Sequence, residues 1–279
     1  MPYRTTPKMA ARKESRRRTL VITGDDFGLT PGINRGIVHA HRHGVLTNAS
    51  LMVTATFAPE AIDLARRTPS LSLGVHLLLV DGRACLPASR IPSLADGSGH
   101  FRTTAGRFVR DWLLSRVDSG EVEREVRAQI EAVISAGIRP THLDSHKHVH
   151  MWPPVFEMVA RVAQDYRIPA IRLAIERPVA ALVVESRRDP DVRAQAIDNA
   201  IMAPLAWMDR RALERHGVAP AWFVGRVHTG LLTPELFERT LGRLPEGRAE
   251  MMTHPGFVDE QLRSIGTRLR TERERELEL

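Results

Sequence analysis

The sequence predicts an α/β protein with a parallel sheet, because two patterns alternate along the chain. Short apolar runs bounded by turn residues, typical of buried strands, alternate with amphipathic stretches that indicate helices. This alternation is typical of repeated strand–helix units, in which helices cover a parallel sheet. The chain has 279 residues, 43% of them apolar, which is enough for one large core, so we expect a single domain.

The expected strands are about seven in number. Each is a run of apolar or β-branched residues that ends at turn residues or polar residues. They cover residues 20–23, 49–53, 71–78, 142–144, 170–173, 222–227 and 250–253.

Helix boundaries are marked by proline at the start and by glycine at the end. Thr30 and Pro31 predict the N-cap and the first residue of a helix that ends at Gly44. Another helix is expected over residues 121–136, directly before Gly137. Further helices are expected over residues 59–67, 153–166, 190–216 and 234–241.

Four segments do not follow this alternation. Residues 1–18 carry many basic side chains without apolar periodicity, and we expect a disordered basic tail there. Residues 19–265 should form the folded domain, and residues 266–279 a charged C-terminal helix or tail. The stretches 81–106 and 176–188 are long loops, which in compact domains often act as lids or substrate-binding elements.

The composition excludes some classes of protein. A single cysteine, Cys85, excludes an internal disulfide, and no signal-like or long apolar segment is present, so we expect a cytoplasmic location. The net charge of +7 suits anionic partners, but the arginines are dispersed and aromatic residues make up only 5% of the chain. Nucleic-acid binding usually needs stacking or groove-reading motifs, so we do not expect nucleic acid as a partner.

Two adjacent carboxylates, Asp25 and Asp26, come shortly after the apolar run 20–22. This places them at the carboxyl end of a strand, where the active sites of α/β proteins are built. Two carboxylates in one cleft repel each other, so the site needs a cation, a shared proton or different roles for the two acids. The alternative is that both acids only cap the following turn.

Histidines and one further acid follow three other expected strands. His76 ends one strand, His254 precedes Pro-Gly after another, and a third strand runs into the segment 141–150. That segment contains Asp144 and four histidines, at positions 142, 146, 148 and 150. Because the carboxyl ends of parallel strands meet at one face, these groups should converge with the acid pair.

A catalytic metal ion would account for this combination of residues. Imidazole nitrogen and carboxylate oxygen suit zinc, with iron, nickel, cobalt and manganese as alternatives, and one carboxylate with two histidines leaves positions for water and substrate. In an extended segment His146, His148 and His150 share one face, whereas in a helical turn His146 and His150 do. The other histidines could contact substrate, orient ligands or be solvated. His254 could be a general acid or a turn residue.

Four ordered motifs resemble the YdjC-like, or ChbG-like, carbohydrate deacetylases over about residues 19–265. They are Thr-Gly-Asp-Asp-Phe-Gly at 23–28, Gly-Val-His-Leu at 74–77, Thr-His-Leu-Asp-Ser-His-Lys-His-Val-His at 141–150 and His-Pro-Gly-Phe at 254–257. The resemblance implies a distorted TIM-like (β/α) barrel related to the polysaccharide deacetylases. It also implies metal-dependent hydrolysis of the N-acetyl group of an N-acetylglucosamine unit.

Carried over residue by residue, the resemblance implies roles for the candidate residues. Asp25 resembles the general base that accepts a proton from water. The ligands of one divalent ion, zinc or magnesium, would be Asp26, His76 and His146. His254 or a neighbouring acid would protonate the departing amine. Contacts with substrate or with the ligands are expected from the remaining candidates, which are Asp144, His148, His150 and Arg172.

Loop residues resemble one branch of this family, the hopanoid-associated HpnK branch. The resemblance covers residues 76–83, Leu86-Pro87 and Ile91-Pro92. It implies an N-acetylglucosaminyl hopanoid as substrate, in the biosynthesis of hopanoid lipids. The alternatives are a soluble chito-oligosaccharide as substrate, or a non-catalytic sugar-binding regulator on the same barrel.

The expected partner is therefore an N-acetylated sugar or a glycolipid. Basic residues in the segment 12–18 would let the protein bind peripherally to anionic lipid at the inner membrane face, at about 1 kcal/mol per basic residue. The alternative is a solvated tail. Many barrels dimerise, so a homodimer is an alternative to a monomer, although no apolar stripe in the sequence assigns an interface.

Overall fold

The computed structural model describes residues 18–176, 189–218 and 221–279. Nearly all of the expected basic tail at 1–18 and of the expected loop at 176–188 therefore lies outside the described residues. No helix within the described ranges has the length and the apolar character needed to cross a membrane.

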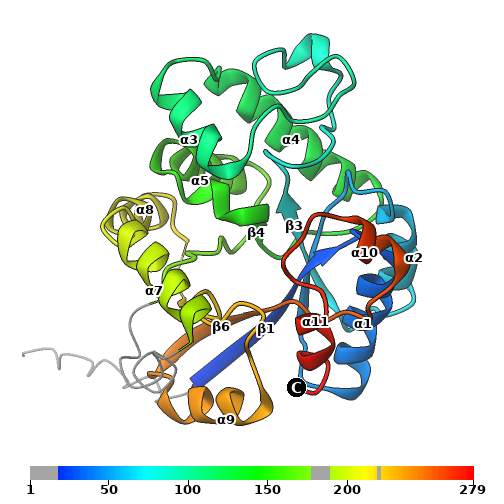
Figure 1. Cartoon of the computed structure of the whole chain (residues 1–279). Helices are drawn as coiled ribbons and strands as arrows, with labels where there is room; N and C mark the ends of the chain where they lie inside the picture. Colours follow the sequence, from blue (N-terminus) through cyan, green and yellow to red (C-terminus); the bar gives the residue numbers. More distant parts are fainter. Residues whose placement is uncertain (1–17, 177–188, 219–220) are drawn as a thin grey trace, which may run out of the picture.

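Parallel strands form one six-stranded sheet in the order β4-β3-β2-β1-β6-β5 (Figure 1). Every neighbouring pair is parallel, as the alternation of strands and helices predicted. The strands are β1 Arg18–Phe27, β2 Asn48–Leu51, β3 Ser72–Leu77, β4 Leu143–Ser145, β5 Trp222–Val224 and β6 Gly247–Thr253. The α/β class is thereby confirmed.

Residues 170–173 do not form the expected strand, so the prediction of about seven strands in a barrel was wrong in this respect. Ile171 makes an isolated parallel bridge to β4, and Glu176, three residues beyond the expected strand, makes one to β5, so residues 171–176 form a bridging segment. The N–H of Ile175 donates to the carbonyl of Leu173 at 2.7 Å, so the backbone turns locally instead of continuing a ladder. The sheet is a curled half-barrel whose two edge strands are bridged by this segment.

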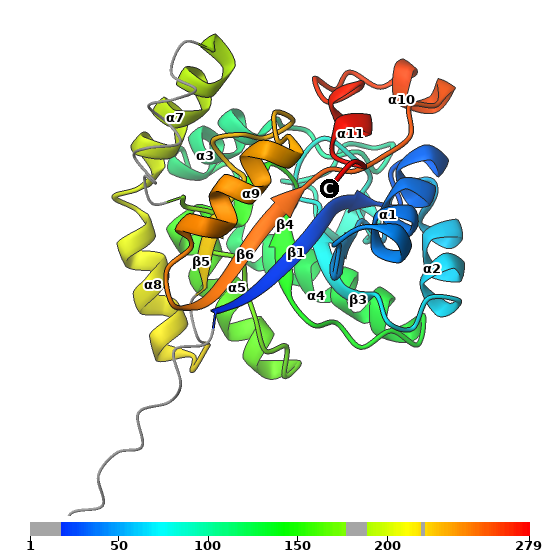
Figure 2. The same cartoon turned by 90° about the horizontal axis from the view of Figure 1, so that it is seen from below.

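Helices pack around the outside of the curled sheet (Figure 2). The predicted N-cap of the first helix is confirmed, because Thr30 Oγ1 accepts a hydrogen bond from the N–H of Ile33 at 3.2 Å. The α-helices are α1 Pro31–His43, α2 Ala58–Arg66, α3 Ala105–Leu113, α4 Ser119–Ser135, α5 Pro153–Asp165, α7 Pro190–Met202, α8 Ala206–Arg215, α9 Pro234–Arg243, α10 Glu260–Ser264 and α11 Glu272–Arg275. The short 3-10 helices are η1 Ala88–Arg90 and η2 His146–Met151.

The single helix expected over residues 190–216 is two helices, α7 and α8. Pro204 lies between them, and a proline inside a helix removes a backbone donor and clashes with the preceding turn. On α8, Asp209 is buried, and neither of its carboxylate oxygens has a hydrogen-bond partner among the described residues. Burial raises the pKa of this carboxyl group to about 8.

The long loop expected over residues 81–106 is packed against α4. Ile91 in this loop is fully buried. The carboxylate of Glu125, on α4, accepts hydrogen bonds from the backbone N–H groups of Cys85 and Leu86 at 2.7 and 3.0 Å. Apolar packing and these hydrogen bonds therefore fix a segment that has little regular structure of its own.

Candidate active site

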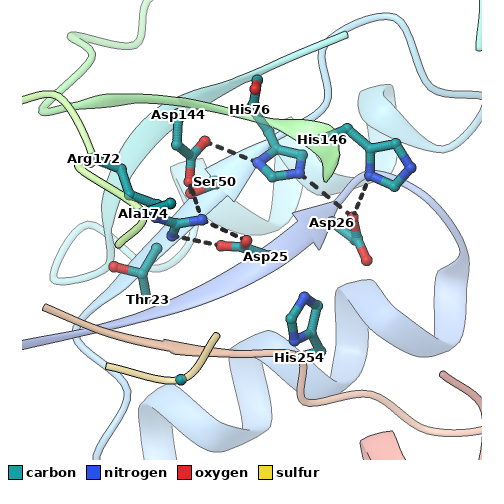
Figure 3. A network of polar contacts seen from close by, with 12 residues as sticks. Thr23, Asp25, Asp26, Ser50, His76, Asp144, His146, Arg172, Ala174 and His254 are labelled. Carbon is teal, nitrogen blue, oxygen red and sulfur yellow. Dashed lines mark hydrogen bonds and ion pairs between the residues drawn. The ribbon is translucent and has the colours of Figure 1, made fainter. Parts of the chain in front are cut away.

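The carboxyl ends of neighbouring strands meet on one side of the sheet and bring the predicted site residues together (Figure 3). They come from β1 (Asp25 and Asp26), β3 (His76), the start of η2 (His146) and the residue after β6 (His254). Four of the five are buried, whereas 21% of the His146 side chain is exposed. The cluster is therefore accessible to solvent at His146.

A bulge at the end of β1 lets both acids face the cluster. The pairing with β2 is regular at Thr23 and Gly24, and its register shifts before Phe27. Asp26 has a φ of 68°, a left-handed conformation that residues other than glycine rarely adopt. In a regular strand, neighbouring side chains point to opposite faces, so only an irregularity of this kind allows Asp25 and Asp26 to point to the same side.

Asp26, His76 and His146 form a group with the spacing of metal ligands. Asp26 Oδ1 lies 3.6 Å from His76 Nε2 and 3.4 Å from His146 Nδ1, and one ligand atom of each residue lies within 4.8 Å of the others. Two ligands at about 2.1 Å from a tetrahedral ion are about 3.4 Å apart. The observed separations therefore fit a shared ion, and they are long for direct hydrogen bonds.

Asp144 orients His76 from the other side of the ring. Its Oδ1 lies 2.8 Å from His76 Nδ1, which leaves Nε2 directed at Asp26. A carboxylate behind a metal-binding histidine is the usual arrangement in such sites. Burial lowers the pKa of His76, but the carboxylates of Asp144, Asp25 and Asp26 together raise it to about 9. Ser50 Oγ donates to Asp144 Oδ2 at 2.7 Å, which holds that carboxylate in place.

His142 supports this arrangement from a greater distance. Its Nε2 lies 3.0 Å from Ser50 Oγ, so the hydroxyl group connects the ring to Asp144. Gly74 lies against the ring, and a Cβ atom at this position would come within 2.4 Å of it. Burial lowers the pKa of His142. The glycine of the Gly-Val-His-Leu motif thus makes room for a histidine of the next motif.

Arg172 joins Asp25 to Asp144. Its Nη1 and Nη2 donate to the two oxygens of Asp25 at 2.6 and 2.8 Å, and Nη1 also lies 2.8 Å from Asp144 Oδ2. The Nε atom donates to Glu250 at 2.8 Å. Burial lowers the pKa of Arg172, but Asp144, Asp25 and Glu250 raise it well above its usual range, so the guanidinium stays charged.

A second group, Asp25, His76 and Asp144, also has ligand atoms within 4.8 Å of one another. Its donors suit a metal ion less well, because Arg172 already contacts both oxygens of Asp25 and one oxygen of Asp144. The other oxygen of Asp144 contacts His76. The guanidinium is therefore the cation of this second group.

The histidine-rich segment is neither extended nor a regular helix. η2 is kinked, with left-handed φ values of 53° at both Lys147 and His148. This kink directs His146 toward Asp26 and separates it from the two histidines that follow.

His148 and His150 pack elsewhere and are not part of the group formed by Asp26, His76 and His146. The His148 ring lies edge-on to Phe223 with 6.3 Å between ring centroids, and its pKa is lowered well below the usual range by burial and by nearby arginines. His150 is fully buried, and its Nε2 lies 2.9 Å from the carbonyl oxygen of Arg172. His150 thus supports the backbone that carries Arg172.

His254 lies beside the two acids of β1 (Figure 3). Its Nδ1 is buried and has no hydrogen-bond partner among the described residues. Burial lowers the pKa of His254 to about 4, so the ring is neutral near pH 7 in this state. Its backbone N–H donates to the carboxylate of Glu276.

Three partners of the site, two buried and one partly buried, were not found from the sequence. Arg273 Nη2 donates to Asp26 Oδ2, and although burial raises the pKa of Asp26, Arg273 and His146 lower it well below its usual range. The other two are Glu250 and Ser50. Arg273 is 247 positions from Asp26 along the chain, Glu250 is 78 positions from Arg172, and Ser50 is 94 positions from Asp144. Ser50 and Glu250 lie in expected strands, but no local pattern in the sequence connects residues at such separations.

The curled parallel sheet and the carboxylate–histidine cluster at its carboxyl end define an α/β protein with a polar site of catalytic character. The YdjC-like protein family matches residues 19–279, and the chain belongs to this family. The match confirms the family resemblance, and the hopanoid branch stays a prediction.

Named relatives cover most of the chain. A carbohydrate deacetylase from Geobacillus stearothermophilus is 32% identical over 248 residues, which cover 88% of this chain and 83% of the relative. A chitooligosaccharide deacetylase from Klebsiella pneumoniae (strain 342) is 31% identical over 254 residues, which cover 88% and 84%. The crystal structure of an Enterococcus faecalis V583 protein, whose name refers to cellobiose-phosphate cleavage, is similar, with a TM-score of 0.73 and 26% identity, over 94% of this chain and 89% of that chain.

Proposed function

We propose that this protein is a metal-dependent N-deacetylase that removes the acetyl group from an N-acetylglucosamine unit. The relatives named as carbohydrate and chitooligosaccharide deacetylases support a sugar deacetylase. The observation that carries the proposal is that two adjacent acids have different partners. Asp26 faces two imidazoles, whereas Asp25 is held apart by a guanidinium. A non-catalytic sugar-binding regulator would have no use for a second carboxylate placed beside the ligand group.

Asp26, His76 and His146 would hold one divalent ion. Zinc suits two imidazole nitrogens and a carboxylate oxygen, whereas magnesium prefers ligand sets made of oxygen. When bound, such an ion polarises a carbonyl group and lowers the pKa of water. The exposed side of His146 is the side from which we expect the acetamide group to enter.

Asp25 is the proposed general base. The two hydrogen bonds from Arg172 fix the orientation of the carboxylate, and each oxygen keeps a lone pair for the proton of an attacking water. Arg172 is itself held by Asp144 and Glu250, so the base is part of a rigid network. A general base must stay within reach of the proton that it accepts, and a carboxylate held in this way keeps one orientation.

His254 is the proposed proton donor to the departing amine. Amide hydrolysis moves one proton from water to nitrogen, so the proton that Asp25 accepts is also the proton that the amine needs. His254 therefore does not have to begin the reaction protonated, which agrees with its lowered pKa of about 4. Because an imidazole ring has two nitrogens, it can accept the proton at one and release it at the other.

A glycolipid is the first candidate for the complete substrate. An apolar cavity of about 690 Å³ lies among the bridging segment, α7 and α8, with Leu173, Ala200, Trp207 and Trp222 in its lining. Leu173 directly follows Arg172 in the chain, so the backbone connects the cavity lining to the site. Cavities of this size and character accept drug-sized apolar groups, and a hopanoid aglycone is such a group. The resemblance of residues 76–83 to the hopanoid branch supports the same substrate.

A soluble chito-oligosaccharide is the second candidate, and the name of the Klebsiella relative favours it. Acetate release from an N-acetylglucosaminyl hopanoid and from N-acetylchitobiose, each with and without a chelator, tests both candidates. Chelator-sensitive release from the lipid supports the full proposal, and release from N-acetylchitobiose alone moves the substrate to chito-oligosaccharides. Binding of either compound without acetate release, with zinc present, would refute the enzymatic function and favour a regulator.

A further inference from the structure

The C-terminal segment, expected as a charged helix or tail, returns to the site. Arg273 on α11 is only 1% exposed, although the surrounding residues 271–276 carry many charges. Its Nη2 donates to Asp26 Oδ2, and its Nε donates to the carbonyl oxygen of Leu269 at 3.3 Å. Its Nη1 has no hydrogen-bond partner in the described parts of the chain, so the contact with Asp26 is the principal polar contact of this guanidinium.

The same segment is anchored by a second buried residue, Glu276. Its carboxylate accepts hydrogen bonds from the backbone N–H groups of Gly230 and His254, which lie after β5 and β6. The carbonyl oxygen of Arg273 accepts a further hydrogen bond from the N–H of Gly256 at 3.2 Å. The segment is therefore fixed to the loops of the site, and Arg273 has a defined position relative to Asp26.

The two oxygens of Asp26 have different partners. Oδ1 is the atom that lies near His76 Nε2 and His146 Nδ1, whereas Oδ2 is bound to Arg273. A carboxylate with two unengaged oxygens can turn about its Cβ–Cγ bond and bind an ion through either oxygen or both. A guanidinium on one oxygen prevents this rotation and leaves the other oxygen for the ion.

We infer that Arg273 is a positioning residue for the metal ion, because it holds Asp26 so that Oδ1 faces His76 and His146. The inference rests on the metal site of the proposed function. It makes the C-terminal segment part of that site, although the segment supplies no ligand. Residues that orient metal ligands usually contribute about 10- to 100-fold to metal affinity, so the effect is large enough to measure without substrate.

The experiment is a calorimetric titration of the metal-free full-length protein with zinc chloride. Arg273→Met should weaken zinc binding by about 10- to 100-fold. Arg273→Lys should weaken it less, because lysine keeps the charge but not the planar fork of donors. Arg275→Met, on the same helix but exposed, is the matched control and should bind zinc as the wild type does.

A second set of variants, made in an Asp26→Asn protein, distinguishes a positioning role of Arg273 from a general loss of structure. If Arg273 acts through Asp26, Arg273→Met should weaken zinc binding by less than about threefold further in an Asp26→Asn protein. The melting temperature of each metal-free variant shows whether it folds, and Arg273→Lys serves as the test protein if the methionine variant does not. Zinc affinity of the folded variant within about twofold of the wild type would overturn the inference. Failure of the wild type itself to bind zinc would instead refute the metal site of the proposed function.

Discussion

Replacing Asp25 with asparagine tests the proposed general base with the least disturbance of its surroundings. The side chain keeps its size, and its oxygen can still accept one hydrogen bond from Arg172, but it can no longer accept the water proton. Among the described residues, the two other nearby acids have other proposed roles, because Asp26 belongs to the proposed ligand group and Asp144 is shared between Arg172 and His76. Turnover should therefore fall strongly.

The expected size of the effect follows from the role. Loss of a general base lowers kcat by about 10²- to 10⁴-fold, and a 10³-fold loss corresponds to about 4 kcal/mol of transition-state stabilisation. The protein should still fold, because Arg172 keeps Asp144 and Glu250 as ionic partners; we expect a loss of about 1–3 kcal/mol in the free energy of unfolding. Zinc content should not change, because Asp25 is outside the proposed ligand group.

The assay is acetate release at saturating substrate, combined with metal analysis and urea unfolding of the same preparation. Glu250→Gln is the matched control, since it also removes one carboxylate from Arg172 but at a residue outside the proposed ligand group. We expect this control to keep kcat within about tenfold of the wild type. Turnover of Asp25→Asn similar to that of the control would show that Asp25 is not the base. Loss of zinc from Asp25→Asn would instead place Asp25 among the ligands.

Three further predictions address the ligands, the stability and the cavity. His76→Ala and His146→Ala should each lose bound zinc, and unchanged zinc content by metal analysis would remove that histidine from the ligand group. Asp209 stays protonated up to about pH 8 in the folded state but ionises near its usual pKa of 3.8 when unfolded, so the free energy of unfolding should fall as pH rises from 4 to 8. Asp209→Asn should reduce this slope in urea unfolding at pH 5 and pH 8, and an unchanged slope would contradict the assignment. Ala200→Trp should raise KM for the glycolipid by about tenfold and leave N-acetylchitobiose turnover unchanged, because the indole occupies the apolar cavity; equal effects on both substrates would disconnect the cavity from the aglycone.

Much of the site could be predicted because its residues stand in short motifs at strand ends. Asp25, Asp26, His76 and His146 each lie within or next to a strand of a parallel sheet, and the carboxyl ends of such strands meet by geometry. His254 follows the same rule after β6. The residue types then indicate the chemistry, since two imidazoles and a carboxylate suit a divalent ion.

Other local predictions were wrong where a single residue changed the backbone. Pro204 divides the helix expected over residues 190–216, and a turn closed by Ile175 and Leu173 follows the single bridge that Ile171 makes to β4. The expected end of β1 at residue 23 was also too early, because the strand continues through the acid pair by way of a bulge. A bulge depends on the pairing with a neighbouring strand, which the apolar pattern of one segment does not contain.

The sequence by itself determined the α/β class, the family, the acids and histidines of the candidate site and their placement at strand ends, because these depend on local periodicity and on motifs of a few residues. Only the tertiary structure shows which partners hold the two adjacent acids in place. Asp25 is set apart by Arg172, 147 positions away, and Asp26 is oriented by Arg273, 247 positions away. Contacts at such separations depend on how the sheet curls and on where the C-terminal segment packs. A linear pattern of apolar and charged residues specifies neither the curl of the sheet nor the packing of that segment.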